Sequence, residues 1–389
     1  MKKNILFVVD ERKMGGVSVL FEDMMTLLDI TNYNIDLLIL HNNGDSLQNL
    51  PKSINVIYGT PYFEAIDYTM QDVIKKKNIN LLFKKIRVVL DMKTGRIEKV
   101  IKRERKKILK KQYDTEIAFK DGFTALFTIF GNSKKKIHWL QYEYKKTNPN
   151  QKYDKLFKKI LPQFNQIIAV SDNVKKHFNA VYNLGDKVSV IYNVINYDKI
   201  LKKSNEECDL VLNSNNINIV SVGRIHHAKG YDRLINVIAK LKEFDGELTR
   251  RLKVYIYGDG PLFFELKKLI HSLNLDDIIF LAGQVANPYK YVKKFDLFIL
   301  PSNFEAFGLV IIEAMTLKIP VLATKTSVTD KLINNNINGL VVENSIDGIY
   351  NGLKKIIENR ELIAKYKNNL TDYFYDNNEQ LEKIKQILD

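Results

Sequence analysis

Short apolar runs alternate with amphipathic stretches along the whole chain. Residues 4–9 form an apolar run of the kind that is buried in a parallel sheet, and a helix is predicted for about 17–28. Further strand-like runs in the first half cover residues 35–40, 54–58, 115–119, 137–140, 167–170 and 188–192. Because strands and helices alternate, we predict a parallel sheet with helices on both faces.

This alternation is interrupted once and then resumes. Polarity rises near Asn193, and residues 202–207 are charged and turn-rich. Beyond them, strand-like runs occur at 217–222, 252–257, 278–281, 295–300, 321–323 and 339–342. We therefore predict an α/β protein with two similar domains facing across a cleft, 1–195 and 196–370, and a C-terminal helix, 371–389, that can pack back on the first domain. Ligands of open α/β sheets bind beyond the carboxyl ends of the strands, so the cleft is the expected site.

The composition is that of a globular protein without disulfides. Of the 389 residues, 45% are hydrophobic and 11% are aromatic, which is ample for packed cores. The single cysteine, Cys208, cannot form an intramolecular disulfide, and no secretory leader pattern opens the chain, so we expect a cytoplasmic location. No apolar run approaches the roughly 18 residues of a membrane-spanning helix, so none is expected.

Positive charge is concentrated in the first half. Residues 1–195 contain 34 Lys and Arg against 20 Asp and Glu, whereas the remainder contains 26 against 25. The densest basic run, 99–111, is interleaved with apolar residues at helical spacing, which predicts a basic amphipathic helix. Such a helix can lie on an anionic membrane, where each Lys or Arg contributes about 1 kcal/mol; a solvated helix face is the alternative. No nucleic-acid module accompanies the charge, so we expect no nucleic-acid partner.

Two carboxylates in the second half flank a predicted strand-loop-helix junction. Glu305 lies in the loop and Glu313, eight residues later, lies on the second turn of the helix. Between them, the free amides of Gly308, Leu309 and Val310 favour a phosphate dianion, aided by the helix dipole. One carboxylate can then accept hydroxyls on the sugar side of that phosphate and the other on the ribose side, which suits a nucleotide-sugar. Alternatively, Glu313 is an exposed helix residue and Glu305 merely a charge that the dipole favours.

Two further loops could approach a phosphate. Gly15 and Gly16 follow the first strand and precede a helix, although many such turns need glycine for geometry alone. In the loop 221–230, Arg224 and Lys229 supply two cations that suit a diphosphate, with scattered surface charges as the alternative. His226 and His227 in the same loop have no carboxylate or cysteine at the spacing of metal ligands, so no metal site is expected.

Taken together, these motifs occur in an order that resembles glycosyltransferase family 4. They are Gly15-Gly16, Gly223-Arg224 with Lys229-Gly230, Gly258-Asp259-Gly260-Pro261, Pro301-Ser302, and Glu305 through Glu313. The resemblance is strongest over 217–342; in the first half it rests on the paired glycines, 167–171 and 190–193. It implies a glycosyltransferase-B fold of two Rossmann-like domains, with the donor bound mainly to the second. It also implies retention of anomeric configuration without a divalent metal or another cofactor.

The resemblance also implies roles for single residues. Arg224 and Lys229 would hold the diphosphate of the donor, Glu305 would bind hydroxyls of the transferred sugar, and Glu313 would hold the ribose. Amides near Gly16 and at 307–309 would surround the phosphates. The full set expected to bind the donor, besides these charged residues, is Gly15, Gly16, Gly223, Phe307, Gly308 and Leu309.

The chain departs from the family pattern at one point. Many members carry a histidine or aspartate after the strand that corresponds to 137–140, close to the reacting sugar. Here the sequence is His138-Trp139-Leu140-Gln141. If the family histidine falls at Gln141, an amide takes its role; if the register slips, His138 serves instead. His138 can equally be a strand residue that points into the core.

We therefore expect an enzyme that is peripheral on the inner face of the plasma membrane. It would move a hexose or N-acetylhexosamine from a nucleotide diphosphate sugar, expected to be UDP-linked, to a glycan in bacterial capsule, exopolysaccharide or lipopolysaccharide synthesis. A lipid-linked acceptor is expected because the basic first half would attract lipid diphosphates and anionic headgroups. Two alternatives stay open: a nucleotide-sugar epimerase or hydrolase of the same fold, and a non-catalytic partner subunit of another glycosyltransferase.

Overall fold

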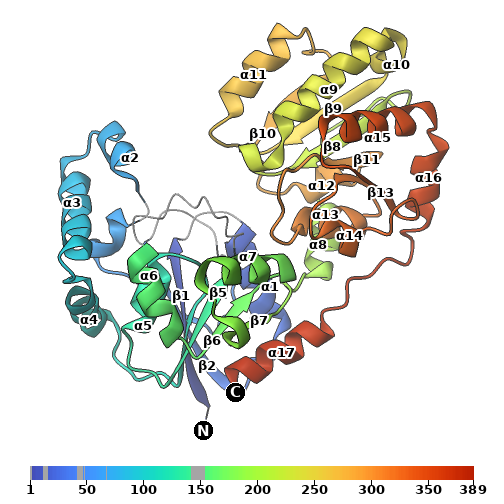
Figure 1. Cartoon of the computed structure of the whole chain (residues 1–389). Helices are drawn as coiled ribbons and strands as arrows, with labels where there is room; N and C mark the ends of the chain where they lie inside the picture. Colours follow the sequence, from blue (N-terminus) through green and yellow to red (C-terminus); the bar gives the residue numbers. More distant parts are fainter. Residues whose placement is uncertain (1, 12–15, 42–46, 48, 67, 142–153) are drawn as a thin grey trace. The chain divides into compact units, whose positions relative to one another are not determined.

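The computed structural model describes residues 2–11, 16–41, 47, 49–66, 68–141 and 154–389. The chain divides into two compact units (Figure 1). The first unit consists of 1–195 together with 377–389, and the second unit consists of 196–376. Among the described residues, no helix is long and apolar enough to cross a membrane.

The first unit is built on a parallel sheet of seven strands in the order β3-β2-β1-β4-β5-β6-β7. These strands are β1 Lys3–Glu11, β2 Tyr33–His41, β3 Asn55–Tyr58, β4 Thr115–Ala118, β5 Lys135–Leu140, β6 Gln166–Ala169 and β7 Val188–Val190. The central strand β1 is buried on both faces, because Ile5, Leu6, Phe7 and Val8 have no exposed surface. This burial explains why β1 is a continuous apolar run rather than an alternating one.

Helices surround this sheet, and the last one comes from the end of the chain. They are α1 Gly16–Leu27, α2 Met70–Lys75, α3 Ile79–Lys93, α4 Ile97–Ile108, α5 Phe123–Ile129, α6 Asp154–Ile160, α7 Asp172–Tyr182 and α17 Asn378–Leu388. The amide of Tyr192 donates to Gln380 Oε1 at 2.9 Å, and the hydroxyl of Tyr33 donates to Asp389 Oδ1 at 2.9 Å. The C-terminal helix α17 is therefore bound to the first unit.

The second unit is built on a parallel sheet of six strands in the order β10-β9-β8-β11-β12-β13. Its strands are β8 Ile217–Val222, β9 Leu252–Tyr257, β10 Ile279–Gly283, β11 Leu297–Leu300, β12 Val321–Thr324 and β13 Gly339–Val342. Its helices are α8 Tyr197–Ser204, α9 Tyr231–Phe244, α10 Gly246–Arg250, α11 Phe263–Ser272, α12 Tyr289–Val292, α13 Leu309–Thr316, α14 Thr329–Leu332, α15 Ile346–Glu358 and α16 Glu361–Asn368. A continuous apolar core joins the inner strands to α9, α11 and α15.

Both sheets share one connectivity. In each, the chain starts at an inner strand, adds two strands on one side, and then crosses back to add the others on the opposite side. The strand order therefore reverses between β1 and β4 in the first unit and between β8 and β11 in the second. Ligands of open α/β sheets bind at such switch points, beyond the carboxyl ends of the strands. The predicted organisation as two parallel α/β sheets is confirmed.

The predicted basic amphipathic helix forms as α4, but its apolar face is covered. Ile97, Val100 and Ile101 are buried. Arg105 is also buried and donates to both carboxylate oxygens of Glu116, at 2.8 and 2.7 Å. Ile97, Val100 and Ile101 therefore serve packing within the first unit, whereas Ile108 at the end of the helix is half-buried.

Candidate functional site

At the switch point of the second sheet, hydrogen bonds hold two loops together. The loop after β8 covers 223–230, and the loop after β11 covers 301–308. The amide of Asn303 donates to Ala228 O at 2.8 Å, and its side chain donates to His227 O at 2.7 Å. Arg233, on the first turn of α9, donates to Pro301 O at 2.5 Å. The residues that the sequence places 76 positions apart, Lys229 and Glu305, therefore meet here.

An ion pair between Lys229 and Glu305 forms the centre of this site. Lys229 Nζ lies 2.7 Å from Glu305 Oε1, and Ser302 Oγ donates to the same oxygen at 2.6 Å. Glu305 is only 9% exposed. Burial acts to lower the pKa of Lys229, but the negative charge of Glu305 and neighbouring groups outweighs it and raises that pKa above its usual value. The Lys229 ammonium therefore stays charged at neutral pH.

Glycines allow the backbones of this site to approach one another. Gly230 has a φ of 62°, and a Cβ at that position would lie 2.2 Å from Pro301 O. Gly258 has a φ of 147°, and a Cβ there would lie 1.9 Å from Gly223 O. Both positions combine a left-handed backbone with contact too close for any side chain. Gly230 and Gly258 are therefore needed for the geometry of these loops.

The helix α13 begins directly beside the ion pair. Gly308 precedes it with a φ of 83°, and the first turn, from Leu309, contains no acidic residue and receives no side-chain cap from Gly308. The first amides of a helix have no partner within it, so they are available to an anion. Phe307 is buried, with its ring 6.4 Å from that of Tyr375. The loop 301–308 thus places the first residues of α13 at the switch point.

The second carboxylate, Glu313, is held on α13 by a tyrosine. It is half-buried, and its Oε1 accepts a hydrogen bond of 2.9 Å from the hydroxyl of Tyr289, a buried residue at the start of α12. The alternative of an exposed helix residue therefore does not describe Glu313. Nothing in the sequence pattern indicated Tyr289, since it lies 24 positions away in a separate short helix.

The second cation, Arg224, is exposed in the loop after β8. Within the described part of the chain, it forms no ion pair with a carboxylate. Burial first, and then the charge of Arg224, lowers the pKa of His226. His226 Nδ1 accepts from the Ala228 amide at 3.4 Å. No group of three or more His, Cys, Asp or Glu side chains among the described residues could hold a metal ion.

The first unit presents a different ion pair at its own switch point. Asp10, near the end of β1, lies 2.6 Å from Lys120, which follows β4. Gly16 is the first residue of α1 and is exposed, whereas Gly15 lies outside the described residues. Sequence reasoning missed Asp10 and Lys120, because their proximity depends on which strands are neighbours.

His138 lies in the core of the first unit. It is fully buried in β5, with its ring centre 5.3 Å from that of Phe164 and its Nε2 3.5 Å from Asp121 Oδ1. Oδ2 of the same carboxylate accepts a hydrogen bond of 3.1 Å from the backbone N–H of Gln141. In this structure His138 has no exposed surface with which to touch a sugar, which favours its interpretation as a core residue. Asp121 was missed, although an Asp-Gly pair after a strand signals a loop.

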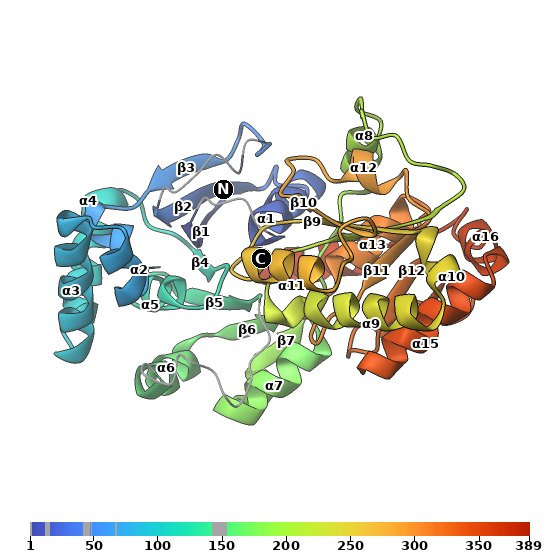
Figure 2. The same ribbon diagram turned by 90° about the horizontal axis from the view of Figure 1, so that it is seen from above.

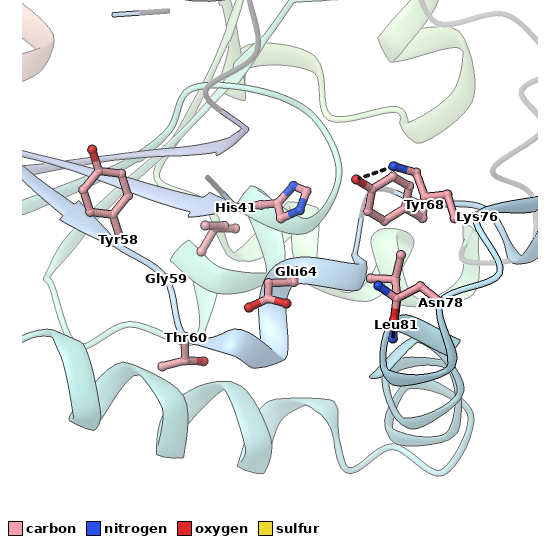
Figure 3. A pocket seen from close by; sticks show the side chains of 10 residues that line it. His41, Tyr58, Gly59, Thr60, Glu64, Tyr68, Lys76, Asn78 and Leu81 are labelled. Atoms are coloured by element: carbon pink, nitrogen blue, oxygen red, sulfur yellow. Dashed lines mark hydrogen bonds between the residues drawn. The ribbon is translucent and has the colours of Figure 1, made fainter. Parts of the chain in front are cut away.

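The first unit also contains a polar pocket of about 510 Å³, apart from its switch point (Figure 3). It lies beside the ends of β2 and β3 and the helices α2 and α3. Figure 3 shows His41 pointing into it from the end of β2, with Tyr68 and Lys76 joined by a hydrogen bond on the other side. The lining residues are Leu40, His41, Tyr58, Gly59, Thr60, Glu64, Tyr68, Lys76, Asn78 and Leu81. Sequence reasoning did not find this pocket.

The structure brings most of the predicted residues together in one unit. Those at the switch point of the second unit or on the adjoining helix α13 are Arg224, Lys229, Glu305, Glu313, Gly223, Phe307, Gly308 and Leu309. Gly16 and His138 belong to the first unit. Pro301-Ser302 is among the predicted motifs, but the hydrogen bond from Ser302 to Glu305 was not predicted.

Comparisons with known proteins identify the family of the chain. The family model of "Glycosyl transferases group 1" matches residues 202–372, which include both loops and α13. The chain is 31% identical over 266 residues to the N-acetylgalactosamine-N,N'-diacetylbacillosaminyl-diphospho-undecaprenol 4-alpha-N-acetylgalactosaminyltransferase of Campylobacter jejuni. That match covers 66% of this chain and 70% of the relative.

Solved structures show the same fold over nearly the whole length. HepE from Anabaena, in complex with UDP and glucose, aligns with a TM-score of 0.71 at 18% identity, covering 99% of each chain. TarM aligns with a TM-score of 0.72 at 16% identity, covering 100% of this chain and 99% of TarM. The matching family model and the relative that is 31% identical show that this chain belongs to the group 1 glycosyl transferases and is a glycosyltransferase.

Proposed function

We propose that the chain is a retaining glycosyltransferase of family 4 that moves a hexose or N-acetylhexosamine from a UDP-sugar to a lipid-linked glycan. The observation that carries the proposal is the Lys229–Glu305 pair at the switch point, next to the start of α13. The similar structures of HepE hold UDP with glucose, or UDP-glucose. The curated relative from Campylobacter jejuni is named for a diphospho-undecaprenol acceptor.

In this proposal, the diphosphate of the donor binds between two cations and a helix start. Lys229 supplies a fixed ammonium, Arg224 an exposed guanidinium, and the first turn of α13 its free amides. Guanidinium groups bind phosphate oxygens in a bidentate manner, and helix starts favour anions. Donors that are already in position stabilise the charge that develops on a leaving diphosphate. We therefore expect catalysis without a divalent metal or another cofactor.

The two carboxylates would orient the sugar and the ribose. A carboxylate has two oxygens with about four acceptor positions. Lys229 and Ser302 both bond Oε1 of Glu305, which leaves acceptor capacity for hydroxyls of the transferred sugar. Glu313 shares one oxygen with the hydroxyl of Tyr289 and would accept the ribose hydroxyls with the rest of its capacity.

The resemblance to family 4 supports a substitution on one face of the sugar. The acceptor oxygen forms a bond to the anomeric carbon while the bond from that carbon to the phosphate oxygen breaks. The proton of the acceptor hydroxyl passes to the departing diphosphate, so no separate carboxylate base is required. Release of the product and the nucleoside diphosphate completes the reaction.

The basic first half supports an acceptor at an anionic membrane surface. Lipid diphosphates and anionic headgroups are both attracted to a domain with a net charge of +14 over residues 1–195. We therefore place the enzyme in bacterial surface-glycan synthesis, peripheral on the inner face of the plasma membrane. Capsule, exopolysaccharide and lipopolysaccharide are all compatible with this acceptor class.

A two-stage experiment tests the proposal. First, thermal unfolding is measured with a panel of nucleoside diphosphates and their sugars, since a ligand of the native state raises its stability. A shift with UDP and a UDP-sugar is expected. Second, a UDP-sugar donor and a lipid-diphosphate acceptor are combined. Mass spectrometry identifies the product, and NMR determines the configuration at the anomeric carbon of the transferred sugar. Free sugar or an epimerised donor without transfer would contradict the proposal.

A further inference from the structure

A row of apolar side chains is exposed on α2 and α3. On α3, Ile79, Phe83 and Leu90 are 68%, 66% and 53% exposed. With Ile86, they recur at intervals of four, three and four residues, which places them on one side of a helix. The exposed apolar row, called here the α2–α3 stripe, consists of Met70, Ile74, Ile79, Phe83, Ile86 and Leu90. Six of the fourteen exposed large apolar residues of the described chain thus lie within 21 positions.

The opposite side of α3 is fixed to the first unit. Val88 is buried, and Asp91 accepts a hydrogen bond of 3.0 Å from the hydroxyl of Tyr62. Lys84 pairs with Glu64, and Lys85 donates to Ile66 O at 3.2 Å. Figures 1 and 2 show α3 at the edge of the first unit, beside α2 and α4. The helix is therefore held firmly while the stripe faces outward.

Cations border the stripe. Residues 70–93 contain seven Lys and Arg against two Asp, a net charge of +5. Lys75, Lys77, Arg87 and Lys93 are exposed. Of the two acids, Asp72 caps α2 through Thr69, and Asp91 binds Tyr62. The surface therefore combines exposed apolar groups with cations, as the interfacial helices of peripheral proteins do.

We propose that the α2–α3 stripe inserts into the headgroup region of an anionic lipid bilayer. This inference rests on the proposed lipid-linked acceptor and assigns membrane binding to α2 and α3. A second copy of the chain is the less suitable occupant, because two stripes packed together would bring their bordering cations close to one another. An anionic lipid surface offers both acyl chains for the stripe and negative charge for the cations.

The polar pocket adjoins the stripe at the connection between α2 and α3. Asn78, which lines the pocket, immediately precedes the stripe residue Ile79 and caps α3 through the Leu81 amide at 3.0 Å. Lys76, another lining residue, follows the last turn of α2. A bilayer that holds the stripe therefore brings lipid headgroups to the border of this pocket.

Vesicle flotation with the full chain tests the inference. Vesicles of phosphatidylcholine alone are compared with vesicles that also contain phosphatidylglycerol, and the variant is Ile79→Gln/Phe83→Gln/Leu90→Gln. These side chains are exposed, so circular dichroism and the melting temperature should match those of the wild type. The matched control is Val211→Gln/Phe244→Gln/Phe264→Gln, three exposed residues of the second unit. The stripe variant should bind anionic vesicles at least about tenfold more weakly than the wild type. The control variant should bind them as the wild type does.

The charge of the surface is tested separately. Lys75→Gln/Lys77→Gln should weaken binding to anionic vesicles at low salt more than Lys99→Gln/Lys106→Gln on α4 does. Wild-type flotation by the stripe variant, or a stripe-dependent dimer in analytical ultracentrifugation, would overturn the inference. The UDP-induced thermal shift separates the two proposals. If UDP raises the melting temperature but the protein does not float with vesicles, this inference alone is refuted. If the protein floats with vesicles but no nucleotide-sugar raises its melting temperature, the proposed function is refuted.

Discussion

The switch points of the two sheets share a topology and an ion pair but differ in their surroundings. In the first unit Asp10 and Lys120 lie 2.6 Å apart, and in the second unit Lys229 and Glu305 lie 2.7 Å apart. The second pair is flanked by the start of α13 and by the exposed guanidinium of Arg224. In the first unit, α5 also begins after a left-handed glycine, Gly122, close to Lys120 in the sequence, but the described residues there include no exposed arginine that corresponds to Arg224.

This difference shows how one connectivity can serve two roles. The strand order fixes where a ligand can approach, whereas the side chains and helix starts at that point decide which chemistry is bound. The second unit combines Lys229, Arg224 and the start of α13 at its switch point, whereas the excess positive charge and the α2–α3 stripe lie in the first. Under the two proposals above, the second unit binds the phosphorylated donor and the first binds an acceptor at a lipid surface.

The largest effect is expected from removing the central charge of the second switch point. Lys229→Met and Glu305→Gln should each lower transfer by about 10²–10³-fold, because a preorganised charged group at the leaving diphosphate or sugar is lost. Isothermal titration calorimetry should also show weaker UDP binding by Lys229→Met. Lys120→Met, the matched change in the first unit, should leave UDP binding unchanged. Equal losses of UDP affinity in both lysine variants would refute the distinction between the two sites.

A loss of stability is expected where the loops of the second switch point touch. Gly230→Ala or Gly258→Ala should lower the free energy of unfolding by about 2 kcal/mol or more, since a Cβ would meet a carbonyl oxygen in a left-handed backbone. Gly246→Ala is the control, because a Cβ there meets no atom within 4 Å. Urea denaturation measures all three. A Gly230→Ala protein as stable as Gly246→Ala would mean that the loops are not in contact.

A smaller effect is expected at the ribose side. Tyr289→Phe removes the hydrogen bond to Glu313 and should cost about 0.5–1.5 kcal/mol of UDP binding, because the carboxylate loses its orientation. Glu313→Gln should cost more than Tyr289→Phe, since it alters the group that accepts the ribose hydroxyls. Calorimetry with uridine diphosphate and with its 2′-deoxy analogue checks this assignment. The assignment would be contradicted if Glu313→Gln and the wild type preferred uridine diphosphate over the 2′-deoxy analogue by the same factor in affinity.

The smallest effect concerns pH. The pKa of Lys229 is raised above its usual 10.5, so its contribution to stability is complete below that value and is lost as pH rises through the raised pKa. The difference in unfolding free energy between wild type and Lys229→Met should therefore stay constant from about pH 6 to 9 and fall only in stronger alkali. Urea denaturation at several pH values measures it. A difference that changes near neutral pH would show that another group controls the pair.

Much of the fold follows from the sequence for a simple reason. Buried parallel strands are continuous apolar runs. In the described part of the chain, those runs predicted each strand from β1 to β13 to within a few residues. The local part of the site, Gly308 and the start of α13, follows from short-range patterns as well. The approach of Lys229 to Glu305 could be expected only through a family resemblance, because 76 residues separate them and strand order decides their distance.

The helices α3 and α4 show where sequence reasoning fails. Both carry apolar and basic residues at helical spacing, and the denser basic run on α4 suggested a membrane face. The spacing indicates that a helix has an apolar side but not what covers that side. In the structure, Ile97 and Ile101 of α4 pack inside the first unit, whereas Ile79 and Phe83 of α3 are exposed. For the same reason, the sequence could not decide whether His138 faced the core or a ligand.

A crystal structure with bound UDP tests the central claim most directly. The account predicts that the diphosphate lies within hydrogen-bonding distance of Lys229, Arg224 and the first amides of α13, with the ribose hydroxyls on Glu313. UDP bound elsewhere, with the Lys229–Glu305 pair touching neither phosphate nor sugar, would contradict it.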